Sequence, residues 1–371
     1  MTQTHVFLFG TLRDAALRRV VLGADVPVRQ ATVPGAAAHK VARGDWPVLV
    51  EAAGGRAEGL IAALPAEALA RADWYEGLFG YVRRRVPAET AEGTLEAQAW
   101  CPPEPPPTDG AWDLAVWQAR HGPLARAAAE EALALRGQRP DGETARRWPM
   151  IRARAQARLN AARPAPTTLR RSAGRGDVEV AERRTCYADF FSVEEYDLRH
   201  VTFGGGMSER ITRTAFVSAD AVTVLPYDPA RDRVMVIEQF RAGPFARGDA
   251  EPWSLEAIAG RIDPGEGPEQ AARREAREEA GLALGRLIRL GGYYPTPGAK
   301  TEFLHSYIGL AELPDGAAGL GGVADEHEDI RAHVIGFDRL MELVDTGEAN
   351  NAPLILSALA LAARRDGLRA G

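Results

Sequence analysis

The chain has 371 residues, and its 45 lysines and arginines against 51 aspartates and glutamates give a formal net charge of -6. Single domains mostly stop at roughly 100–200 residues, so this length predicts two domains. The acidic balance excludes the basic footprint of a nucleic-acid-binding protein, and no apolar run reaches the roughly 18 residues that a membrane span needs. With no export signal at the start and only Cys101 and Cys186 as thiols, we expect a cytoplasmic protein.

In chain order, the first hundred residues alternate short apolar runs with glycine and proline turns. Residues 6–9, 47–50 and 59–62 have the composition of strands, and residues 65–74 have helical spacing. The prolines that follow cannot continue a sheet ladder and favour an extended connector. These features predict a small α+β domain over residues 1–105.

The next stretch, residues 106–165, is rich in alanine, arginine and leucine, and it has helical spacing from 112 to 162. A break near 140–142 divides this spacing, so we expect two helices. Prolines and glycines between 163 and 176 have the composition of a second linker. We interpret residues 106–165 as a helical connector with a linker, and residues 166–371 as the second domain.

Strand-like periodicity resumes in the second domain. Residues 214–226 and 233–238 are predicted strands that meet at a turn. One long helical run covers residues 267–280, and a short amphipathic helix over 355–363 is expected to pack against the core.

The most informative segment covers residues 260–282. Pro268 can open a helix because its φ is fixed. Glu275, Glu278 and Glu279 then stand at i, i+3 and i+4 on one helical face. Three neighbouring carboxylates repel one another, so this arrangement favours a bound cation, and magnesium prefers such oxygen ligands. The alternative is a solvated face of ion pairs, which most charge runs are.

The spacing of the fixed residues decides between these two interpretations. The pattern from Gly260 to Gly281 is G-x5-E-x7-R-E-x-x-E-E-x-G, and such a set of letters coincides by chance roughly once in 10^7 windows. With Leu282 after it, the segment resembles the signature of the Nudix hydrolases. The resemblance implies an α/β/α sandwich with two or three magnesium ions, or manganese in their place. It also implies metal ligands at Glu275 and Glu279, help from Glu278, and a loop braced by Glu266 and Arg274.

Residues around the signature resemble the ADP-ribose pyrophosphatase subgroup. There, the carbonyl at the position of Ala259 is a metal ligand, and the position of Arg241 holds an arginine whose planar guanidinium suits a diphosphate. In the acidic loop over 324–331, the resemblance implies Glu326 as the base that deprotonates water and Glu328 as a further metal ligand. Taken alone, this loop would be a solvated acidic segment. The substrate contacts that the resemblance implies are Arg241, Arg261, Thr296, Pro297, Gly298 and Glu302.

The resemblance predicts magnesium-dependent hydrolysis of ADP-ribose to AMP and ribose 5-phosphate, by attack of water on the adenosyl phosphorus. Two alternatives stay open. One is another nucleoside diphosphate derivative as substrate, such as NADH or a nucleotide sugar, and the other is a module that binds ADP-ribose without cutting it. The intact acidic set argues against a pure binder, because a binder has no need of metal ligands and a base together.

Three residues before the signature resemble positions that reach a neighbouring subunit in the family dimer. Phe190, Phe191 and Arg213 match contacts to the adenine and ribose of the neighbour's substrate, so the resemblance implies a domain-swapped homodimer. The alternative for the two phenylalanines is ordinary core packing. The chain departs from the subgroup at Thr214 and Ser218, where glutamate and arginine can stand, and this puts the contacts to adenosine in question.

The first apolar run ends in the turn Gly10-Thr11-Leu12, which offers backbone N–H groups to an anion or a carbonyl at low steric cost. Together with the segment 73–83, which carries Glu76, this turn resembles the γ-glutamylcyclotransferase-like (AIG2-like) fold, a small β-barrel. The resemblance implies that Glu76 moves a proton while a γ-glutamyl amine closes to 5-oxoproline. The alternative is that Glu76 merely ends a helix in a binding or scaffolding domain.

The pairing of the two domains also resembles bacterial proteins associated with tellurite resistance, but no residue explains that phenotype. Both resemblances imply small-molecule substrates, and we expect no nucleic-acid or membrane partner.

Overall fold

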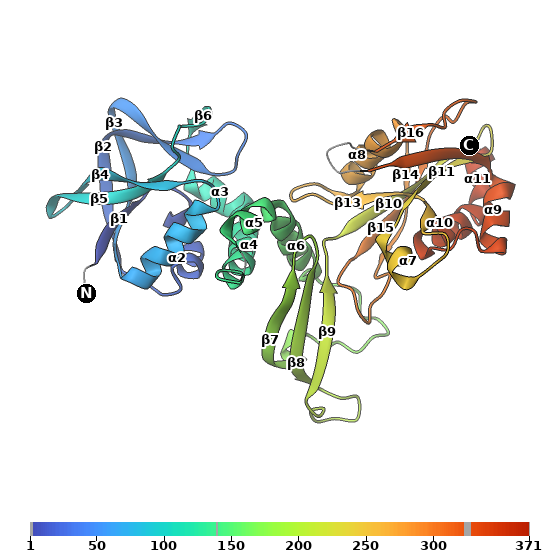
Figure 1. Cartoon of the computed structure of the whole chain (residues 1–371), viewed down its shortest axis with the longest axis horizontal. Coiled ribbons are helices and arrows are strands. Elements are labelled where there is room, and N and C mark those ends of the chain that lie inside the picture. Colours follow the sequence, from blue (N-terminus) through green and yellow to red (C-terminus); the bar gives the residue numbers. More distant parts are fainter. Residues whose placement is uncertain (1–2, 139, 323–327, 371) are drawn as a thin grey trace. The chain divides into compact units, whose positions relative to one another are not determined.

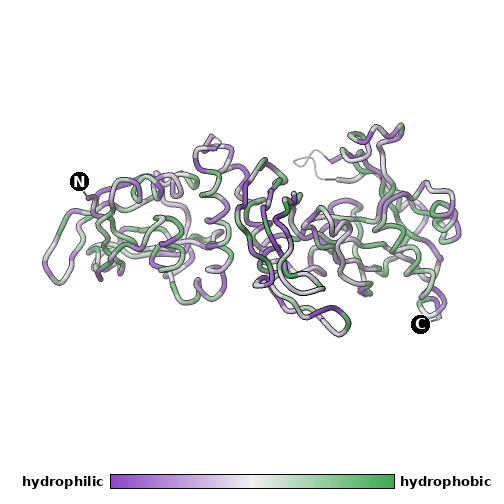
Figure 2. Tube along the Cα trace, turned by 90° about the horizontal axis from the view of Figure 1, so that it is seen from below, coloured by the Kyte–Doolittle hydropathy of each residue, from purple (hydrophilic) through white to green (hydrophobic). Residues whose placement is uncertain are grey.

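The computed structural model describes residues 3–138, 140–322 and 328–370. The chain divides into two units, Met1–Ala165 with Ala188–Phe190, and Pro166–Tyr187 with Phe191–Gly371. We call them the N-terminal and the C-terminal unit, and Figure 1 labels their elements. Hydrophobic stretches run through the middle of each unit (Figure 2). In the described part of the chain, no helix is long and apolar enough to cross a membrane.

The sheet of the N-terminal unit is a closed barrel. Its strands are β1 (Thr4–Leu8), β2 (Val28–Val41), β3 (Pro47–Leu64), β4 (Val82–Thr90), β5 (Gly93–Cys101) and β6 (Thr108–Ala111). β1 pairs antiparallel with β3 and parallel with β5, and β4 lies between β5 and β2. β2 also pairs with β3, which closes the circle, while β6 extends the sheet beside β2. The expected small barrel is therefore confirmed.

Successive side chains of β1 point to opposite faces, as in any strand. Phe7, and Phe9 just after the strand, pack with residues of the other barrel strands, whereas Val6 and Leu8 pack against helices. This close packing needs a glycine at position 59. A Cβ on Gly59 would lie 2.5 Å from the Phe7 ring and 2.6 Å from the Leu8 carbonyl oxygen.

Helices cover the outer face of the barrel. They are α1 (Ala15–Leu22), α2 (Ala66–Gly77), α3 (Leu114–Arg120), α4 (Gly122–Ala134), α5 (Asp141–Arg146) and α6 (Trp148–Ala161). The expectation of two helices between 112 and 162 is therefore wrong. His121 leaves helical geometry at φ -120°, and Pro123 and Pro149 stand in the first turns of α4 and α6, where proline starts a helix. Each of the two predicted helices is therefore divided into two shorter helices.

Two sheets form the C-terminal unit within the described residues. The smaller has the order β7 (Val178–Ala188), β8 (Ser192–His200) and β9 (Ile211–Val217). The larger contains β10 (Ala221–Asp228), β11 (Arg233–Phe240), β12 (Trp253–Glu256), β13 (Ile258–Arg261), β14 (Leu287–Tyr293), β15 (Leu304–Leu310), β16 (Leu320–Gly321) and β17 (Ile330–Gly336). Its order is β14-β15-β10-β11-β17-β16, with β12 beside β11 and β13 beside β10.

Helices flank both faces of the larger sheet. The unit's helices are α7 (Ala242–Arg247), α8 (Pro268–Ala280), α9 (Phe337–Thr346), α10 (Ala352–Ala362) and α11 (Arg365–Ala370). On β11, Met235 and Ile237 pack with alanines of α8, whereas Val234 and Val236 pack with leucines of α9 and α10. Alternate residues of one strand thus face two helical layers, which confirms the expected α/β/α sandwich.

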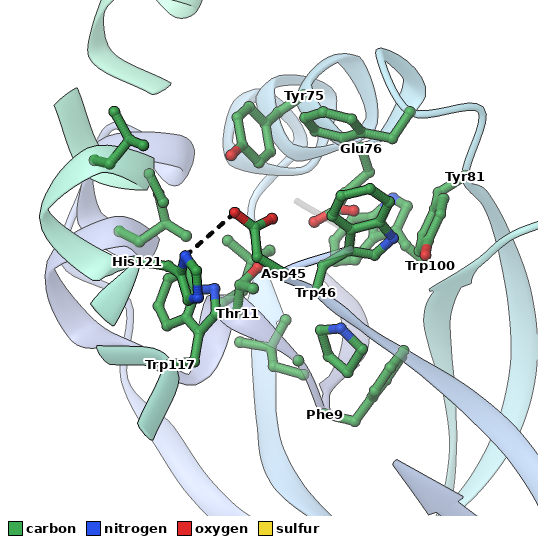
Figure 3. Close-up of a pocket in the computed structure, with 18 of the residues that line it drawn as sticks. Phe9, Thr11, Asp45, Trp46, Tyr75, Glu76, Tyr81, Trp100, Trp117 and His121 are labelled. Atoms are coloured by element: carbon green, nitrogen blue, oxygen red, sulfur yellow. Dashed lines mark ion pairs between the residues drawn. The ribbon is translucent and has the colours of Figure 1, made fainter. Parts of the chain in front are cut away.

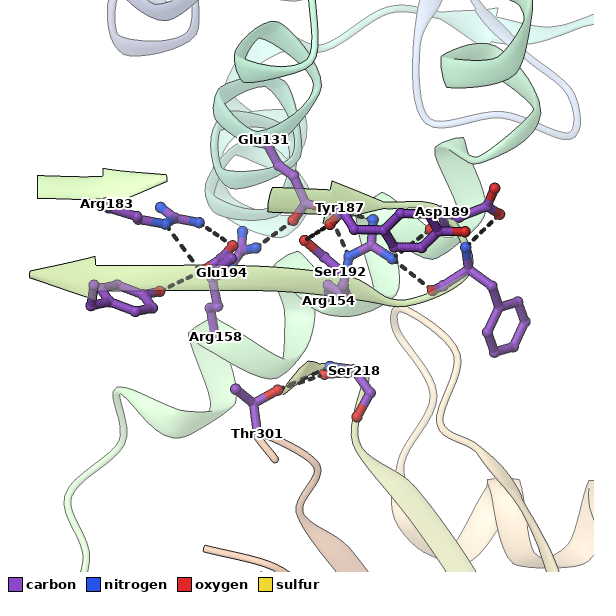
Figure 4. Close-up of polar contacts among 12 residues, drawn as sticks. Glu131, Arg154, Arg158, Arg183, Tyr187, Asp189, Ser192, Glu194, Ser218 and Thr301 are labelled. Carbon is purple, nitrogen blue, oxygen red and sulfur yellow. Dashed lines mark hydrogen bonds and ion pairs between the residues drawn. The ribbon is translucent and has the colours of Figure 1, made fainter. Parts of the chain in front are cut away.

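The prediction of one strand over 214–226 is wrong, because the chain changes sheet within this segment. β9 ends at Val217 and β10 begins at Ala221. Between them, the Ser218 N–H donates to Thr301 Oγ1 at 3.0 Å, and the Thr301 hydroxyl donates to the Ser218 carbonyl at 3.1 Å (Figure 4). A side chain therefore satisfies backbone groups that a continuous strand would pair in the ladder.

A buried ion pair joins α4 and α6 in the N-terminal unit. Arg154 is 1% exposed, its Nε donates to Glu131 at 2.7 Å, and its Nη1 donates to the Phe190 carbonyl at 2.8 Å (Figure 4). Arg158 binds the same carboxylate, but 35% of its side chain is exposed. The two arginines therefore share one acidic partner at different depths.

Arg154→Met should lower the free energy of unfolding of this unit by about 3 kcal/mol, because a buried acid loses one cation and backbone carbonyls lose a donor. Arg158→Met should cost less than about 1 kcal/mol, because the exposed partner is screened by water. Six of the seven tryptophans lie in this unit, so a urea titration followed by tryptophan fluorescence measures its stability. Equal losses in the two variants would contradict this interpretation.

Candidate active site

The helix α8 carries the predicted metal ligands. Pro268 stands in its first turn, and Gly281 ends it in the left-handed region at φ 62°. Its alanines pack on the sheet, and this brings the glutamates to the edge of the buried face. Glu279 is 1% exposed, while 12% of the Glu275 side chain and 37% of the Glu278 side chain are exposed. Glu275 and Glu279 therefore lie deeper than Glu278.

Both deep glutamates lie against the strand β13. The Ala259 N–H donates to Glu279 Oε2 at 3.2 Å. A Cβ on Gly260 would lie 1.9 Å from Glu275 Oε1, so only glycine leaves room for that carboxylate. In an extended strand the N–H and C=O of one residue point to the same side. The Ala259 carbonyl therefore faces the same carboxylates as its N–H.

The positive charge near Glu275 and Glu279 does not offset the effect of burial on their pKa values. Burial raises the pKa of Glu279 to about 9 despite the Ala259 N–H, and burial raises the pKa of Glu275 to about 7 despite Arg274. The charge of Glu328 adds to both increases, so this residue lies close to the two glutamates. Acidic groups from α8 and from the segment before β17 therefore converge.

Arg274 ties the loop before α8 to the helix. Its Nε and Nη2 donate to Glu266 at 3.1 and 3.0 Å. Its Nη1 donates to Glu275 at 2.7 Å and to Glu278 at 2.9 Å, and Nη2 also reaches the carbonyl of Arg261 at 2.9 Å. One guanidinium therefore fixes the loop and orients two acidic side chains.

Arg241 follows the end of β11. Its Nε and Nη2 donate to the two oxygens of Glu256 at 2.7 Å each. This pairing raises the pKa of Arg241, and the charges of Glu279 and Glu328 also contribute, so the guanidinium lies within reach of the acidic cluster. Nη1 has no hydrogen-bond partner in the described part of the chain, and its donors are available to a ligand.

Of the other predicted substrate residues, Arg261 ends β13, whereas Thr296, Pro297, Gly298 and Glu302 lie in and just after a turn that follows β14. Over residues 296–298 the chain folds back, and the Lys300 N–H donates to the Thr296 carbonyl at 2.9 Å. Glu302 binds the Lys300 ammonium at 2.7 Å. The same ammonium lies 6.0 Å from the centre of the Phe191 ring. These contacts place Glu302 and the turn beside one another.

The residues predicted to reach a neighbouring subunit differ in exposure. Phe190 is 39% exposed in the turn after β7, and Arg213 is exposed on β9. Phe191 instead packs its ring 4.7 Å from the ring of Phe216. Glu326, the predicted base, lies outside the described residues, so its role stays a prediction.

The donors on α8 fit an open metal site rather than a closed cage. Among the described residues, no group of three or more His, Cys, Asp or Glu side chains has the arrangement of a metal cage. Magnesium usually takes one or two carboxylates and completes its shell with water and substrate oxygens. Glu275, Glu279 and the backbone beside Gly260 supply the hard oxygen donors that such a site needs.

The N-terminal unit holds a second candidate site, a cavity of about 100 Å³ between the barrel and its helices. Glu76, near the end of α2, lines this cavity (Figure 3). In the described part of the chain its carboxyl has no hydrogen-bond or ion-pair partner, and burial raises its pKa to about 8. A half-buried acid without a partner is costly for folding and marks a candidate functional group.

The predicted turn after β1 lines the same cavity with Gly10, Thr11 and Leu12. Gly10 approaches another loop, because a Cβ there would lie 2.9 Å from the Pro47 ring. Thr11 and Leu12 begin the short helix η1 (Thr11–Arg13). Their N–H groups therefore have no acceptor within that turn.

Several cavity residues were not found from the sequence. Asp45, before β3, binds Arg152 Nη2 at 2.7 Å and lies 3.4 Å from His121 Nδ1. Trp148 of α6 also lines the cavity. These residues come from segments far apart in the chain, so no spacing signals them. The one sequence signal is the number of tryptophans between 112 and 148.

Comparison with known proteins agrees with this division. Residues 217–357 match the NUDIX domain model, and residues 6–117 match the model of gamma-glutamyl cyclotransferase, AIG2-like. A solved structure of an ADP compounds hydrolase is similar to 51% of this chain and 96% of its own, with 22% identity and a TM-score of 0.40.

Curated relatives cover the C-terminal unit. ADP-ribose pyrophosphatase of Escherichia coli (strain K12) is 38% identical over 192 residues, which are 52% of this chain and 91% of the relative. ADP-ribose pyrophosphatase of Haemophilus influenzae is 33% identical over 182 residues, 48% of this chain and 83% of the relative. GDP-mannose pyrophosphatase of Enterobacter sp. is 31% identical over 163 residues, 43% of this chain and 84% of the relative. The chain therefore belongs to the Nudix family of hydrolases, and its N-terminal unit is γ-glutamylcyclotransferase-like.

Proposed function

We propose that the C-terminal unit hydrolyses ADP-ribose to AMP and ribose 5-phosphate. The relatives named ADP-ribose pyrophosphatase support this substrate, because the match covers 91% of the Escherichia coli protein. The observation that carries the reaction is the convergence of Glu275, Glu279 and Glu328 beside Arg241. Buried acids next to a phosphate-binding cation are the groups that metal-dependent hydrolysis of a diphosphate requires.

We infer that the acidic cluster holds two or three divalent ions, Mg²⁺ or Mn²⁺. Bound there, the ions would neutralise phosphate oxygens and lower the pKa of a bound water. The packing of Glu275 against Gly260 and the contact from Arg274 support a fixed position for that carboxylate. The proposed metal ligands are the Ala259 carbonyl and the carboxylates of Glu275, Glu279 and Glu328, with help from Glu278.

In the proposed reaction, the oxygen of water bonds to the adenosyl phosphorus while the bond from this phosphorus to the bridging oxygen breaks. Glu326 is the proposed base that takes the proton of this water. Arg241 is proposed to bind the diphosphate, because its pair with Glu256 orients the guanidinium and leaves Nη1 for phosphate oxygens. The terminal ribose is proposed to meet the turn over 296–298 and Glu302, and Arg261 is a further proposed contact.

We further propose that two copies of the chain pair through the Nudix domain, over residues 166–371. Phe190, Phe191 and Arg213 would then contact the adenosine at the neighbour's site. The exposure of Phe190 and Arg213 supports this arrangement. The free thiols of Cys101 and Cys186 support a reducing compartment, and we propose the cytoplasm.

A nucleotide sugar is the second candidate substrate, because relatives named GDP-mannose pyrophosphatase are 31% and 32% identical to this chain. One panel separates the candidates. The purified chain is incubated with magnesium and ADP-ribose, NADH, GDP-mannose or UDP-glucose, and the products are separated by chromatography. We expect the highest kcat/KM with ADP-ribose. A higher kcat/KM with GDP-mannose would contradict the assignment of ADP-ribose as the substrate. Binding of ADP-ribose without formation of any product would indicate a binding module.

Glu279→Gln should lower kcat for ADP-ribose by roughly 10^2- to 10^4-fold, because a neutral amide replaces a metal-binding carboxylate worth several kcal/mol in the transition state. The fold should persist, since an amide is cheaper to bury than a carboxylate. Glu269→Gln, at an exposed position in the first turn of the same helix, is the matched control and should keep full activity. An unchanged kcat in Glu279→Gln would contradict the assignment of Glu279 as a metal ligand.

The cavity of the N-terminal unit supports a second activity, cyclotransfer of γ-glutamyl amides. The observation that favours it is the carboxyl of Glu76, which lines the cavity and has no hydrogen-bond or ion-pair partner among the described residues. In the proposed step, the α-amino nitrogen bonds to the γ-carbonyl carbon and the amide bond to the amine breaks. Glu76 carries a proton from the attacking nitrogen to the leaving amine. The α-carboxylate is proposed to meet the N–H groups of Thr11 and Leu12.

The pH dependence of this activity follows from the pKa of Glu76. A base acts in its ionised form, and with a pKa of about 8 roughly one tenth of Glu76 is ionised at pH 7. From pH 7 to 9, kcat/KM for a γ-glutamyl amide should therefore rise about tenfold, after correction for the substrate's own amine. Glu76→Gln should abolish the activity at every pH. No turnover by the wild type would leave a binding or scaffolding role.

A further inference from the structure

The turn after β14 is followed by a residue type that is rare in this chain. Lys40 and Lys300 are the only two lysines among the 45 lysines and arginines. Lys300 lies between the proposed substrate contacts over residues 296–298 and Glu302. A lysine ammonium is a compact charge with three rotatable donors, whereas an arginine presents a planar fork. The substrate turn therefore carries donors of a different geometry from those of the arginines elsewhere in the chain.

Lys300 is held in a half-buried ion pair. Its Nζ donates to Glu302 Oε2 at 2.7 Å, and 28% of the lysine and 18% of the glutamate side chain are exposed. The ammonium also lies 6.0 Å from the centroids of the Phe191 and Phe216 rings, which are 4.7 Å from each other. The carboxylate and the rings both favour the charged ammonium. Among the described residues, Glu302 is the one hydrogen-bond partner of Nζ, so further donors of Nζ are left for a ligand.

The backbone on both sides of Lys300 is fixed by the end of β9. The Phe216 N–H donates to the Ala299 carbonyl at 2.7 Å, and the Thr301 N–H donates to the Phe216 carbonyl at 3.0 Å. In addition, Thr301 Oγ1 accepts from the Ser218 N–H and donates to the Ser218 carbonyl (Figure 4). A ligand that binds the ion pair therefore meets groups that are already in position, which lowers the entropic cost of binding.

The strand register relates the ion pair to the acidic cluster. Thr223 of β10 is paired with Ala259 of β13 on one side and with Ser306 of β15 on the other. Neighbouring strands are about 4.8 Å apart, so the backbones at Ala259 and Ser306 are about 10 Å apart. Burial and the charge of Glu302 both raise the pKa of Tyr293, whose hydroxyl lies 3.0 Å from Ser306 Oγ. Glu302 therefore lies near Ser306, two strands away from the backbone that is proposed to bind the metal.

The ion pair offers an acceptor and donors side by side. A hydroxyl group both donates and accepts a hydrogen bond. One of two hydroxyls on adjacent carbons can therefore donate to the Glu302 carboxylate while the other accepts from Lys300 Nζ. An anionic group would be attracted by Lys300 but repelled by Glu302, so the pair favours a neutral diol over a phosphate or a carboxylate. A sugar that lacks one of the two hydroxyls would leave a half-buried polar group without a partner, which lowers affinity.

We propose that Lys300 and Glu302 together bind two adjacent hydroxyls of the terminal sugar, and that Lys300 makes the site select sugars with this diol. The proposal rests on the hydrolysis of ADP-ribose proposed above, and it adds Lys300 to the proposed substrate contacts. The terminal ribose of ADP-ribose carries such a diol. An analogue with 2-deoxyribose in its place differs from ADP-ribose by one oxygen atom, so the two nucleotides isolate the contribution of the diol.

The full chain is assayed with magnesium and either ADP-ribose or this 2-deoxyribose analogue. The wild type should hydrolyse ADP-ribose with a kcat/KM at least about tenfold higher than the analogue. Lys300→Met should lower kcat/KM for ADP-ribose at least about fivefold more than for the analogue, mainly through KM. Lys40→Met is the matched control, because the Lys40 side chain is 41% exposed and lies 3.8 Å from Asp109 in the N-terminal unit. This control should leave both values as in the wild type.

Equal kcat/KM for the two nucleotides in the wild type would overturn the proposal, as would an equal loss for both in Lys300→Met. Thermal unfolding checks that Lys300→Met folds, and Lys300→Arg, which keeps the charge but changes the donor geometry, replaces it if it does not. No hydrolysis of ADP-ribose by the wild type would instead refute the proposed function. Calorimetric titration would then decide the role of Lys300. Tighter binding of ADP-ribose that is lost in the variant would uphold this role, and equal or absent binding of the two nucleotides would overturn it.

Discussion

The burial of Glu275 and Glu279 beside β13 is the constraint on which the site of the C-terminal unit depends. Carboxyls removed from water keep their charge only when positive charge lies near. Arg274 and Arg241 are near, yet the pKa values of the two glutamates stay raised to about 7 and about 9. A core built for stability alone would place apolar side chains here. The fold thus holds acidic groups where an added cation would be strongly stabilised.

The presence or absence of a positively charged partner separates structural from functional acids in the N-terminal unit. Only 8% of the Glu131 side chain is exposed, but Arg154 and Arg158 neutralise it, so it joins two helices. Glu76 has no such partner among the described residues, and it borders a cavity of about 100 Å³. Its neighbour Asp45 is paired across the cavity to Arg152. An acid that borders a cavity and has no partner among the described residues is therefore the feature that points to a ligand, rather than burial itself.

Local signals explain which parts of the structure could be predicted from the sequence. Pro268 and Gly281 mark the ends of α8, and helical spacing alone brings Glu275 and Glu279 to one face. The break between β9 and β10 could not be predicted, because it depends on a hydroxyl from Thr301, far along the chain. In the cavity of the N-terminal unit, only residues in short motifs, Gly10, Thr11, Leu12 and Glu76, could be predicted from the sequence. The residues that α4 and α6 bring to this cavity depend on contacts between distant segments, which leave no spacing in the sequence.

Manganese binding to the Gly260→Ala variant tests the central claim most directly. The added Cβ would lie 1.9 Å from Glu275 Oε1, and this flexible carboxylate can move away without unfolding the unit. Gly243→Ala is the control, because nothing lies within 4 Å of its new Cβ. We predict that Mn²⁺ affinity, measured by electron paramagnetic resonance, falls roughly 10–100-fold in Gly260→Ala alone, at an unchanged unfolding temperature. Equal Mn²⁺ affinity in the wild type and both variants would contradict the account.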